Sequence, residues 1–216
     1  MIGAAIKLNP ARIANSFAIA ATATLIGTTA NAVDGDAWAV LTATNSCTGC
    51  DLSYAELSAA QRSGVVLDYS NLSYAALSGA DISRGSMEGT NFFSASLKAV
   101  NLTEANLLIS NFYMADLSGS NMSDTNLRKA DLSSANAIGV NLSGADLSDA
   151  ILVATDLESA ALIGTVLTGV DFTNTKLNAT DLTDADLSGS NITSGQLSGA
   201  KLCRTVLPWG TSNAGC

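Results

Sequence analysis

Large apolar residues recur at every fifth position along most of this chain. The first, which we call the centre of its pentad, is Leu52 and the last is Leu207, so 32 centres share one unbroken register. Thirty of them are Leu, Ile, Met or Phe, and the exceptions are Arg62 and Ala137. An α-helix needs apolar spacing near 3.6 residues and a β-strand needs two. A spacing of five fits neither element, so the backbone has to turn once in every pentad.

The residues around each centre are typical of a corner. Two positions before the centre the side chain is always small, and one position before it Asp or Asn stands in most pentads. Gly, Asn, Asp and Ser tolerate turn conformations and bond their own backbone. If the small residue and the centre both point inward, the corners of four pentads close one square coil. Such coils stack at about the 4.8 Å strand spacing, and eight of them make a rod roughly 38 Å long.

The phenylalanines at centres test this 20-residue period independently. Phe112 lies four pentads after Phe92, and Phe172 lies twelve pentads after Phe112. All three therefore lie on one face, with Phe92 directly beneath Phe112. The same arithmetic places asparagine columns on two faces, and we interpret them as structural ladders. Their members are Asn71, Asn91 and Asn111 on one face and Asn101, Asn121 and Asn141 on another.

A stack of coils exposes an apolar end and open strand edges unless each end is covered. Residues 34–46 predict a short helical cap that begins at Asp34 or Asp36. The apolar residues available to lie over the first coil are Trp38, Val40 and Leu41.

Two further residues near the ends of the stack lead to structural predictions. Arg62 is a charge at an inward position, which is costly unless paired, so we expect the first coil to be distorted there or Arg62 to turn toward the open end. The repeats end at Pro208, and Trp209 is expected to cover the eighth coil.

Residues 1–32 have the pattern of a secretory signal. Lys7 and Arg12 precede a moderately apolar stretch, and Ala30-Asn31-Ala32 is a small-x-small cleavage site. The alternatives are an uncleaved anchor or an Ala-rich helix. The expected organisation is a signal peptide at 1–32, an N-terminal cap at 33–50, the repeat domain at 51–207 and a C-terminal cap at 208–216.

The repeat A-(D/N)-L-x-x, as in Ala115–Gly119 and Ala145–Asp149, resembles the pentapeptide-repeat family over residues 50–207. The resemblance implies an all-β fold, a right-handed quadrilateral β-helix. The opening Cys47–Leu52 and the tail Cys203–Gly210, followed by Cys216, resemble exported members from cyanobacteria, the thylakoid lumen and other bacteria. That likeness implies export to the periplasm or the thylakoid lumen.

The four cysteines lie at the two predicted ends of the stack and allow three pairings. A disulfide needs Cα atoms within about 7 Å, and several coils separate the ends. The prediction is therefore Cys47–Cys50 and Cys203–Cys216. The rival interpretation makes Cys47 and Cys50 a thioredoxin-like redox pair, which requires a helix N-terminus that lowers a thiol pKa.

Composition excludes several function classes. The chain has no histidine, a net charge of −9 and a pI near 4.2. Without histidine there is no ordinary catalytic triad and little basis for a transition-metal site. The acidic balance has the wrong sign for gripping nucleic acid. We therefore expect no enzyme activity, no cofactor, no metal and no nucleic-acid partner. After signal cleavage we also expect no stable membrane insertion.

Outward apolar residues gather on one face and on the neighbouring face before it. Two interpretations remain open, an interaction surface or aromatic cover for neighbouring strands. The residues of this predicted patch are Tyr54, Tyr69, Tyr74, Phe93, Leu108, Ile109, Tyr113 and Met114.

Three functions follow from these features. The first is a non-enzymatic, exported structural or interaction module that binds an unidentified protein or forms a homodimer. The second is an acidic rod that mimics DNA and acts on a gyrase-type topoisomerase, as a branch of the resembling family does. The third is a thiol-disulfide redox protein that uses Cys47 and Cys50.

Overall fold

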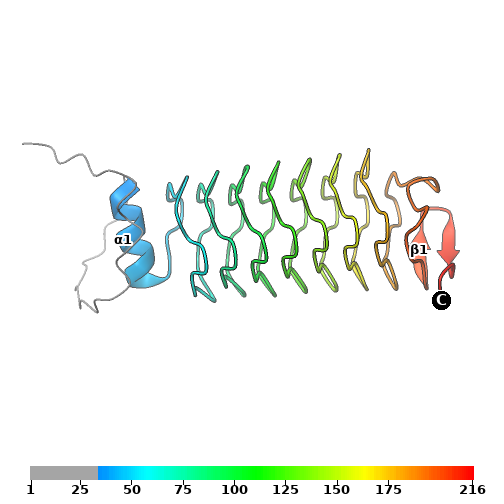
Figure 1. Ribbon diagram of the computed structural model, residues 1–216, viewed down its shortest axis with the longest axis horizontal. Helices are drawn as coiled ribbons and strands as arrows, with labels where there is room; N and C mark the ends of the chain where they lie inside the picture. The colour runs from blue at the N-terminus through cyan, green and yellow to red at the C-terminus, as the bar shows by residue number, and fades with distance from the viewer. Residues whose placement is uncertain (1–33) are drawn as a thin grey trace, which may run out of the picture.

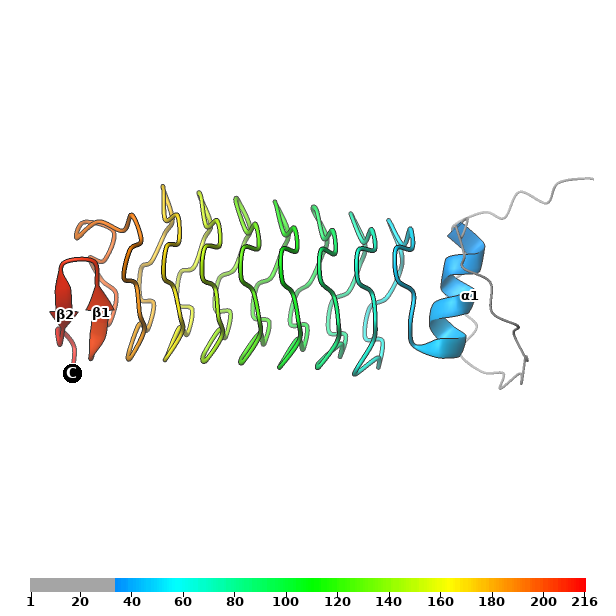
Figure 2. The ribbon, with the colours of Figure 1, turned by 180° about the vertical axis from the view of Figure 1, so that it is seen from behind.

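The computed structural model describes residues 34–216, so the predicted signal peptide lies outside the described residues. Helix α1 (Asp34–Thr44) lies across one end of a straight rod of stacked coils (Figure 1). Strands β1 (Thr205–Leu207) and β2 (Gly210–Ser212) form an antiparallel hairpin at the other end (Figure 2). The rod between them is the predicted pentad region, capped at both ends.

The coils repeat every four pentads, as the sequence register requires. Isolated parallel bridges join residues at equivalent places in consecutive coils, from Ser46 with Val66 to Asp186 with Val206. The amide of Leu52 donates to the carbonyl oxygen of Asn71 at 2.8 Å, and the amide of Asn71 donates back to Cys50 at 2.8 Å. Each face is thus a short parallel ladder whose polar groups are satisfied by the coils on either side.

Each pentad turns through a four-residue bend with a left-handed third residue. In the first regular pentad the amide of Ala55 donates to the carbonyl oxygen of Leu52 at 3.1 Å, and Tyr54 has φ of 58°. Type II turns have this positive φ at the same place. The residue two places after each centre repeats it from Tyr54 to Arg204, with Ser194 the one exception in that range. Glycine is common at this position because it adopts positive φ without a steric cost.

The interior is a continuous apolar column. The centres and the small residues two places before them are almost all buried, and Phe92 stacks on Phe112 with ring centroids 4.9 Å apart. The predicted coincidence of these phenylalanines in consecutive coils is confirmed. Truncating a buried mid-stack Leu to Ala is expected to cost about 2–5 kcal/mol.

Buried hydroxyls tie successive coils together from inside. Thr90 donates to the carbonyl oxygen of Leu67 at 2.8 Å, and Thr155 donates to that of Leu132 at 2.8 Å. Both donors belong to the coil after their acceptors, at positions that size alone marked as inward. A buried hydroxyl needs such a partner, and each bond adds about 1 kcal/mol.

The eighth coil is present as expected, but it opens over residues 191–199. The bridges that would join Asp171 to Asn191 and Lys176 to Gln196 are missing from this part of the described chain. The turn moves one residue forward, so the amide of Gln196 donates to the carbonyl oxygen of Thr193 at 3.2 Å. No further coil follows on these two faces to hold the corner, so the register that neighbouring coils enforce elsewhere is lost.

One of the two alternatives for Arg62 is wrong, and so is the expectation for Trp209. The backbone at Arg62 is regular, with its amide 2.7 Å from the carbonyl oxygen of Asp81, so the first coil is not distorted there. The side chain is half-buried. That Arg62 turns toward the open end stays a prediction, in line with the tendency of long charged side chains to keep their heads near water. Trp209 lies in the turn between β1 and β2 and is 56% exposed, so it does not cover the last coil.

At the other end, α1 supplies the expected apolar cover. Leu41 is buried and Val40 packs partly against the core. The side chain of Trp38 lies outside the described residues.

Candidate interaction surface

Four aromatic rings from successive coils form one continuous row, which we call the aromatic ladder: Tyr54, Tyr74, Phe93 and Tyr113. Tyr54 stacks on Tyr74 with centroids 4.9 Å apart, and Phe93 stacks on Tyr113 at 5.8 Å. Tyr74 and Phe93 join the two pairs edge to face at 5.2 Å. The structure thus brings these four predicted residues together.

The ladder both covers its strands and faces solvent. Tyr54 is 69% exposed and Tyr113 is 39% exposed, whereas Phe93 is half-buried between its two neighbours. Cross-strand aromatic pairs stabilise a sheet, so part of the ring area already has a structural use. The outer edges of four consecutive rings are still open to a partner.

Tyr69 belongs to a different contact. Its hydroxyl donates to Glu88 Oε1 at 2.5 Å, and its ring covers Gly89, where an added Cβ would lie 2.7 Å from Cδ1. The hydrogen bond with Glu88, followed by partial desolvation, raises the pKa of Tyr69. Tyr69 is therefore fastened to the following coil, which favours a structural role for this residue.

Three aliphatic residues complete the predicted patch, and we call them the apolar flank: Leu108, Ile109 and Met114. Ile109 and Met114 are exposed and Leu108 is half-buried. Ile109 has φ of 53°, a rare conformation for a β-branched residue. An exposed apolar side chain in an unfavourable backbone conformation brings the rod no evident stability. This favours the interpretation of the apolar flank as an interaction surface.

Sequence reasoning missed a second set of exposed apolar residues farther along the rod. Ile138, Ile151 and Ile163 are exposed, and each lies on a different face. Scattered single residues of this kind are ordinary on protein surfaces. Ile138 and Ile163, which lie on faces other than that of the ladder, provide matched controls for it.

The charged residues form bridges between coils. Lys98 lies 3.2 Å from Asp116, and Lys176 lies 2.7 Å from Asp156. Burial raises the pKa of Asp116, but hydrogen bonds from Ser118 and the Lys98 ammonium outweigh it and hold that pKa below 3.8. Pairs this exposed contribute little stability each. Among residues 34–216, no group of His, Cys, Asp or Glu is placed to hold a metal ion.

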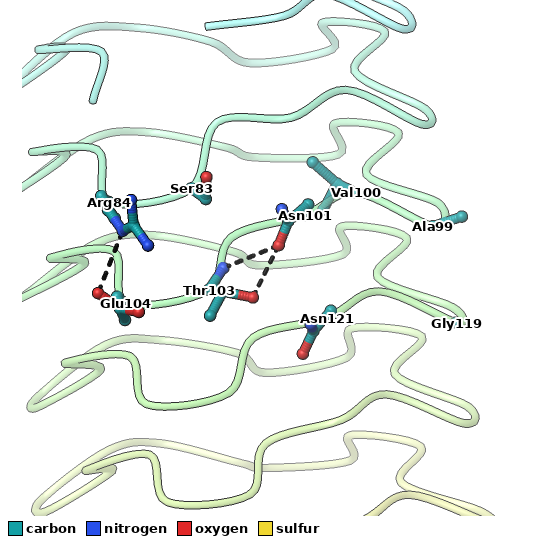
Figure 3. A pocket seen from close by; sticks show the side chains of 9 residues that line it. All are labelled: Ser83, Arg84, Ala99, Val100, Asn101, Thr103, Glu104, Gly119 and Asn121. Carbon is teal, nitrogen blue, oxygen red and sulfur yellow. Dashed lines mark hydrogen bonds and ion pairs between the residues drawn. The ribbon is translucent and has the colours of Figure 1, made fainter. Parts of the chain in front are cut away.

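A shallow polar groove of about 330 Å³ lies on another face (Figure 3). Arg84 and Glu104 pair across one side of it at 3.2 Å, and Thr103 donates twice to Asn101 Oδ1. Its polar groups largely satisfy one another, which leaves little to recognise a ligand. Sequence reasoning missed this pair, although opposite charges at equivalent places in consecutive coils were a signal for it.

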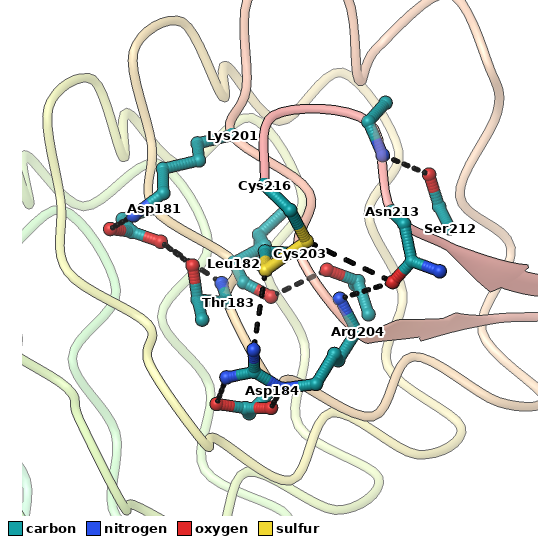
Figure 4. The surroundings of a disulfide bond; sticks show 12 residues. Asp181, Leu182, Thr183, Asp184, Lys201, Cys203, Arg204, Ser212, Asn213 and Cys216 are labelled. Atoms are coloured by element: carbon teal, nitrogen blue, oxygen red, sulfur yellow. Dashed lines mark hydrogen bonds and ion pairs between the residues drawn. A yellow bond between two sulfur atoms is a disulfide. The ribbon is translucent and has the colours of Figure 1, made fainter.

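The cysteines are paired within each end of the rod. Cys47 and Cys50 form a disulfide with Cα atoms 5.6 Å apart, and Cys203 and Cys216 form another at 4.9 Å (Figure 4). The first pair follows the C-terminal end of α1 rather than an N-terminus. The negative end of a helix dipole opposes a thiolate, so the thioredoxin-like interpretation of Cys47 and Cys50 loses its physical basis.

Comparison with known proteins identifies the family to which this architecture belongs. The profile of the family described as pentapeptide repeats matches with eight copies, over residues 46–84, 70–107, 110–149, 150–189 and 172–207. This chain belongs to the pentapeptide repeat family. Its proteins are structural and protein-interaction modules and are generally non-enzymatic. The expected fold, a right-handed quadrilateral β-helix, is confirmed.

Several solved structures are similar to this pentapeptide repeat chain. HetL, involved in heterocyst differentiation regulation in Nostoc sp. strain PCC 7120, is 24% identical, with coverage of 82% and 98% of the two chains and a TM-score of 0.49. QnrB1, a plasmid-mediated fluoroquinolone resistance protein, is 18% identical, with 76% and 89% coverage and a TM-score of 0.41. A pentapeptide repeat protein of the Arabidopsis thaliana thylakoid lumen is 24% identical, with 70% and 87% coverage and a TM-score of 0.26.

No significant match was found among curated protein sequences. Within residues 34–216, no helix is both long and apolar enough to cross a membrane.

Proposed function

We propose that this protein is a non-enzymatic, exported interaction module that binds a protein partner, or a second copy of itself, through the aromatic ladder and the apolar flank. The single observation that carries the proposal is the row of four partly exposed rings over four consecutive coils. Tyr and Phe are favoured anchors at protein interfaces. No other face of the described rod gathers aromatic side chains in this way.

Charge supports a protein partner over DNA mimicry. Six of the eight basic side chains in residues 34–216 pair with carboxylates of neighbouring coils. The acidic residues lie on all four faces, with Asp131, Asp116, Asp81 and Asp146 as one example from each. A surface that imitates a phosphate backbone needs like charges in register along one side, and this arrangement disperses them.

The test is the double variant Phe93→Ser with Tyr113→Ser. If the ladder is an interface, self-association in sedimentation or capture of an identified partner weakens about thirtyfold, the equivalent of a hot spot of about 2 kcal/mol. The matched control is Ile138→Ser with Ile163→Ser, which removes exposed apolar area from two other faces and should leave binding unchanged. A double variant that melts several degrees lower and keeps every association would show that the ladder is only scaffold.

Export is supported by the signal-like pattern of residues 1–32 together with the cysteine pairs, since disulfides persist in oxidising compartments such as the periplasm or the thylakoid lumen. N-terminal sequencing of the native protein decides it. We expect the mature chain to begin at Val33, and an intact N-terminus in a cytoplasmic fraction would contradict export.

A further inference from the structure

The two disulfides stand in opposite surroundings. Cys47 and Cys50 are both buried, and Sγ of Cys47 lies 3.4 Å from the carbonyl oxygen of Ala37 in α1. Cys203 is 7% exposed, but its partner Cys216 lies in the open at the surface. The 203–216 bond therefore has one cysteine open to solvent, whereas the 47–50 bond has none.

A positive charge touches the buried half of the exposed disulfide. Nη1 of Arg204 lies 3.5 Å from Sγ of Cys203, as Figure 4 shows. Two hydrogen bonds from its Nε and Nη2 to Asp184, of 2.5 and 2.6 Å, hold the guanidinium there. A guanidinium beside a cysteine sulfur stabilises the thiolate over the thiol. The carbonyl oxygen beside Cys47 has the opposite effect.

We propose that Cys203–Cys216 is a thiol-disulfide exchange site, attacked at Cys216 by a dithiol reductant and assisted by Arg204, which stabilises Cys203 as the leaving thiolate. The exchange rate rises as the pKa of the leaving thiol falls, and it depends on which sulfur is accessible. Both requirements meet at this bond. The site is independent of the aromatic ladder, which lies near the other end of the rod.

The reaction balances as an ordinary two-electron exchange. A thiolate of the reductant bonds to Sγ of Cys216, the bond between Cys216 and Cys203 breaks, and Cys203 leaves with the electron pair beside Arg204. The second thiol of the reductant loses its proton and attacks the mixed disulfide, which releases Cys216. The reductant ends as a disulfide and the protein as two thiols, after transfer of two electrons and two protons.

Cleavage would loosen the end of the rod. The disulfide joins residues 13 apart in sequence and closes the loop that carries the β1–β2 hairpin. Across the base of that loop the amide of Leu202 donates to the carbonyl oxygen of Ala214 at 2.9 Å, and the amide of Arg204 donates to Asn213 Oδ1 at 3.1 Å. Once the disulfide is open, these two bonds would still tie the segment after β2 to the rod, while β1 stays bonded to the coil before it through Thr205 and Val206.

The experiment treats the oxidised protein with dithiothreitol, stops samples by alkylation and maps each disulfide by mass spectrometry. We expect Cys203–Cys216 to open at least about tenfold faster than Cys47–Cys50, because exposure and the leaving group both favour it. Arg204→Gln should slow the first bond about threefold or more, while Arg204→Lys, which keeps the charge, should restore much of the rate. Arg62→Gln, in the first coil, is the matched control and should change neither rate.

A second measurement separates charge from a loosened loop. In Cys216→Ser the single thiol is Cys203, and ultraviolet titration of its thiolate gives its pKa. We expect that pKa to rise when Arg204→Gln is added. Equal opening rates of the two disulfides would overturn the proposal. A slower rate in Arg204→Gln without any change in the pKa of Cys203 would overturn the part assigned to the guanidinium.

Discussion

Tyr74 and Phe93 meet edge to face, with planes at 87°, although they occupy different places in their pentads. Tyr74 stands two residues after its centre, in the left-handed corner position, and Phe93 stands one residue after its own. The ladder therefore shifts by one pentad position halfway along. This shift divides it into two stacked pairs with Phe93 in contact with a ring on each side.

Phe93 should be the most stabilising member of the ladder. Phe93→Ala removes a half-buried ring with two partners, and aromatic pairs add about 0.5–1.5 kcal/mol each beyond their burial. Tyr54→Ala removes an exposed ring with one partner and should cost clearly less. Urea unfolding of both variants measures the difference, and equal losses would show that ring contacts contribute little to stability.

Gln196 should hold the opened part of the eighth coil. Its Nε2 donates to the carbonyl oxygen of Phe172 at 2.6 Å, at a place where the regular backbone bridges between coils are absent. Gln196→Ala should therefore cost about 1 kcal/mol and raise amide hydrogen exchange near Phe172. Gln61→Ala is the control, because that side chain reaches only the nearby carbonyl of Ala59. Unchanged exchange in Gln196→Ala would contradict this role.

Asp171 should make the rod sensitive to acid. The hydroxyl and amide of Thr173 and the side chain of Asn191 donate to it, which holds its pKa below 3.8. Because the folded pKa is the lower one, its contribution is fully present above pH 3.8 and is lost as the pH falls through the folded pKa.

Thr173→Val tests this assignment because it deletes the hydroxyl donor and keeps the shape. The pKa of Asp171, followed by carboxyl NMR, should rise toward its ordinary value. The opposite shift, or none, would show that the hydroxyl does not stabilise the carboxylate.

Opening the 203–216 disulfide should fray the eighth coil first. Stability in a stack of repeats is largely local, since each coil contacts only its neighbours. In Cys203→Ser with Cys216→Ser, amide exchange should rise near Leu202 and Leu207 and stay unchanged around Leu117. Uniform loss of protection along the rod would show that it unfolds as one unit.

The repeat itself was predictable because one spacing rule governs every interior coil. The four-pentad period alone also places the four ladder rings on one face. It could have predicted the pairing of Tyr69 with Glu88, which occupy neighbouring positions of consecutive coils. Size alone marks the inward threonines in the sequence, although a buried hydroxyl such as that of Thr90 also demands an acceptor.

The features that could not be predicted lie at the ends of the rod, where the outermost coil has no neighbouring coil on one side. The sequence register continues through Ile192 and Leu197, yet the corner between them opens because no ninth coil supports it. Trp209 was expected to cover the rod on hydrophobicity, but the hairpin at 205–212 places it in an exposed turn. Which side chains replace missing backbone partners at such an end depends on three-dimensional fit.

The four-pentad period also determines which insertions and deletions the rod can accept. Adding or removing a whole coil would lengthen or shorten the rod and leave every downstream residue on its own face. A single extra pentad would keep all centres inward but turn everything after it by a quarter of the circumference. Placed between Tyr74 and Phe93, it would move Phe93 and Tyr113 onto the next face and cut the ladder in two. The surface therefore tolerates length changes only in whole coils, whereas the core tolerates them in single pentads.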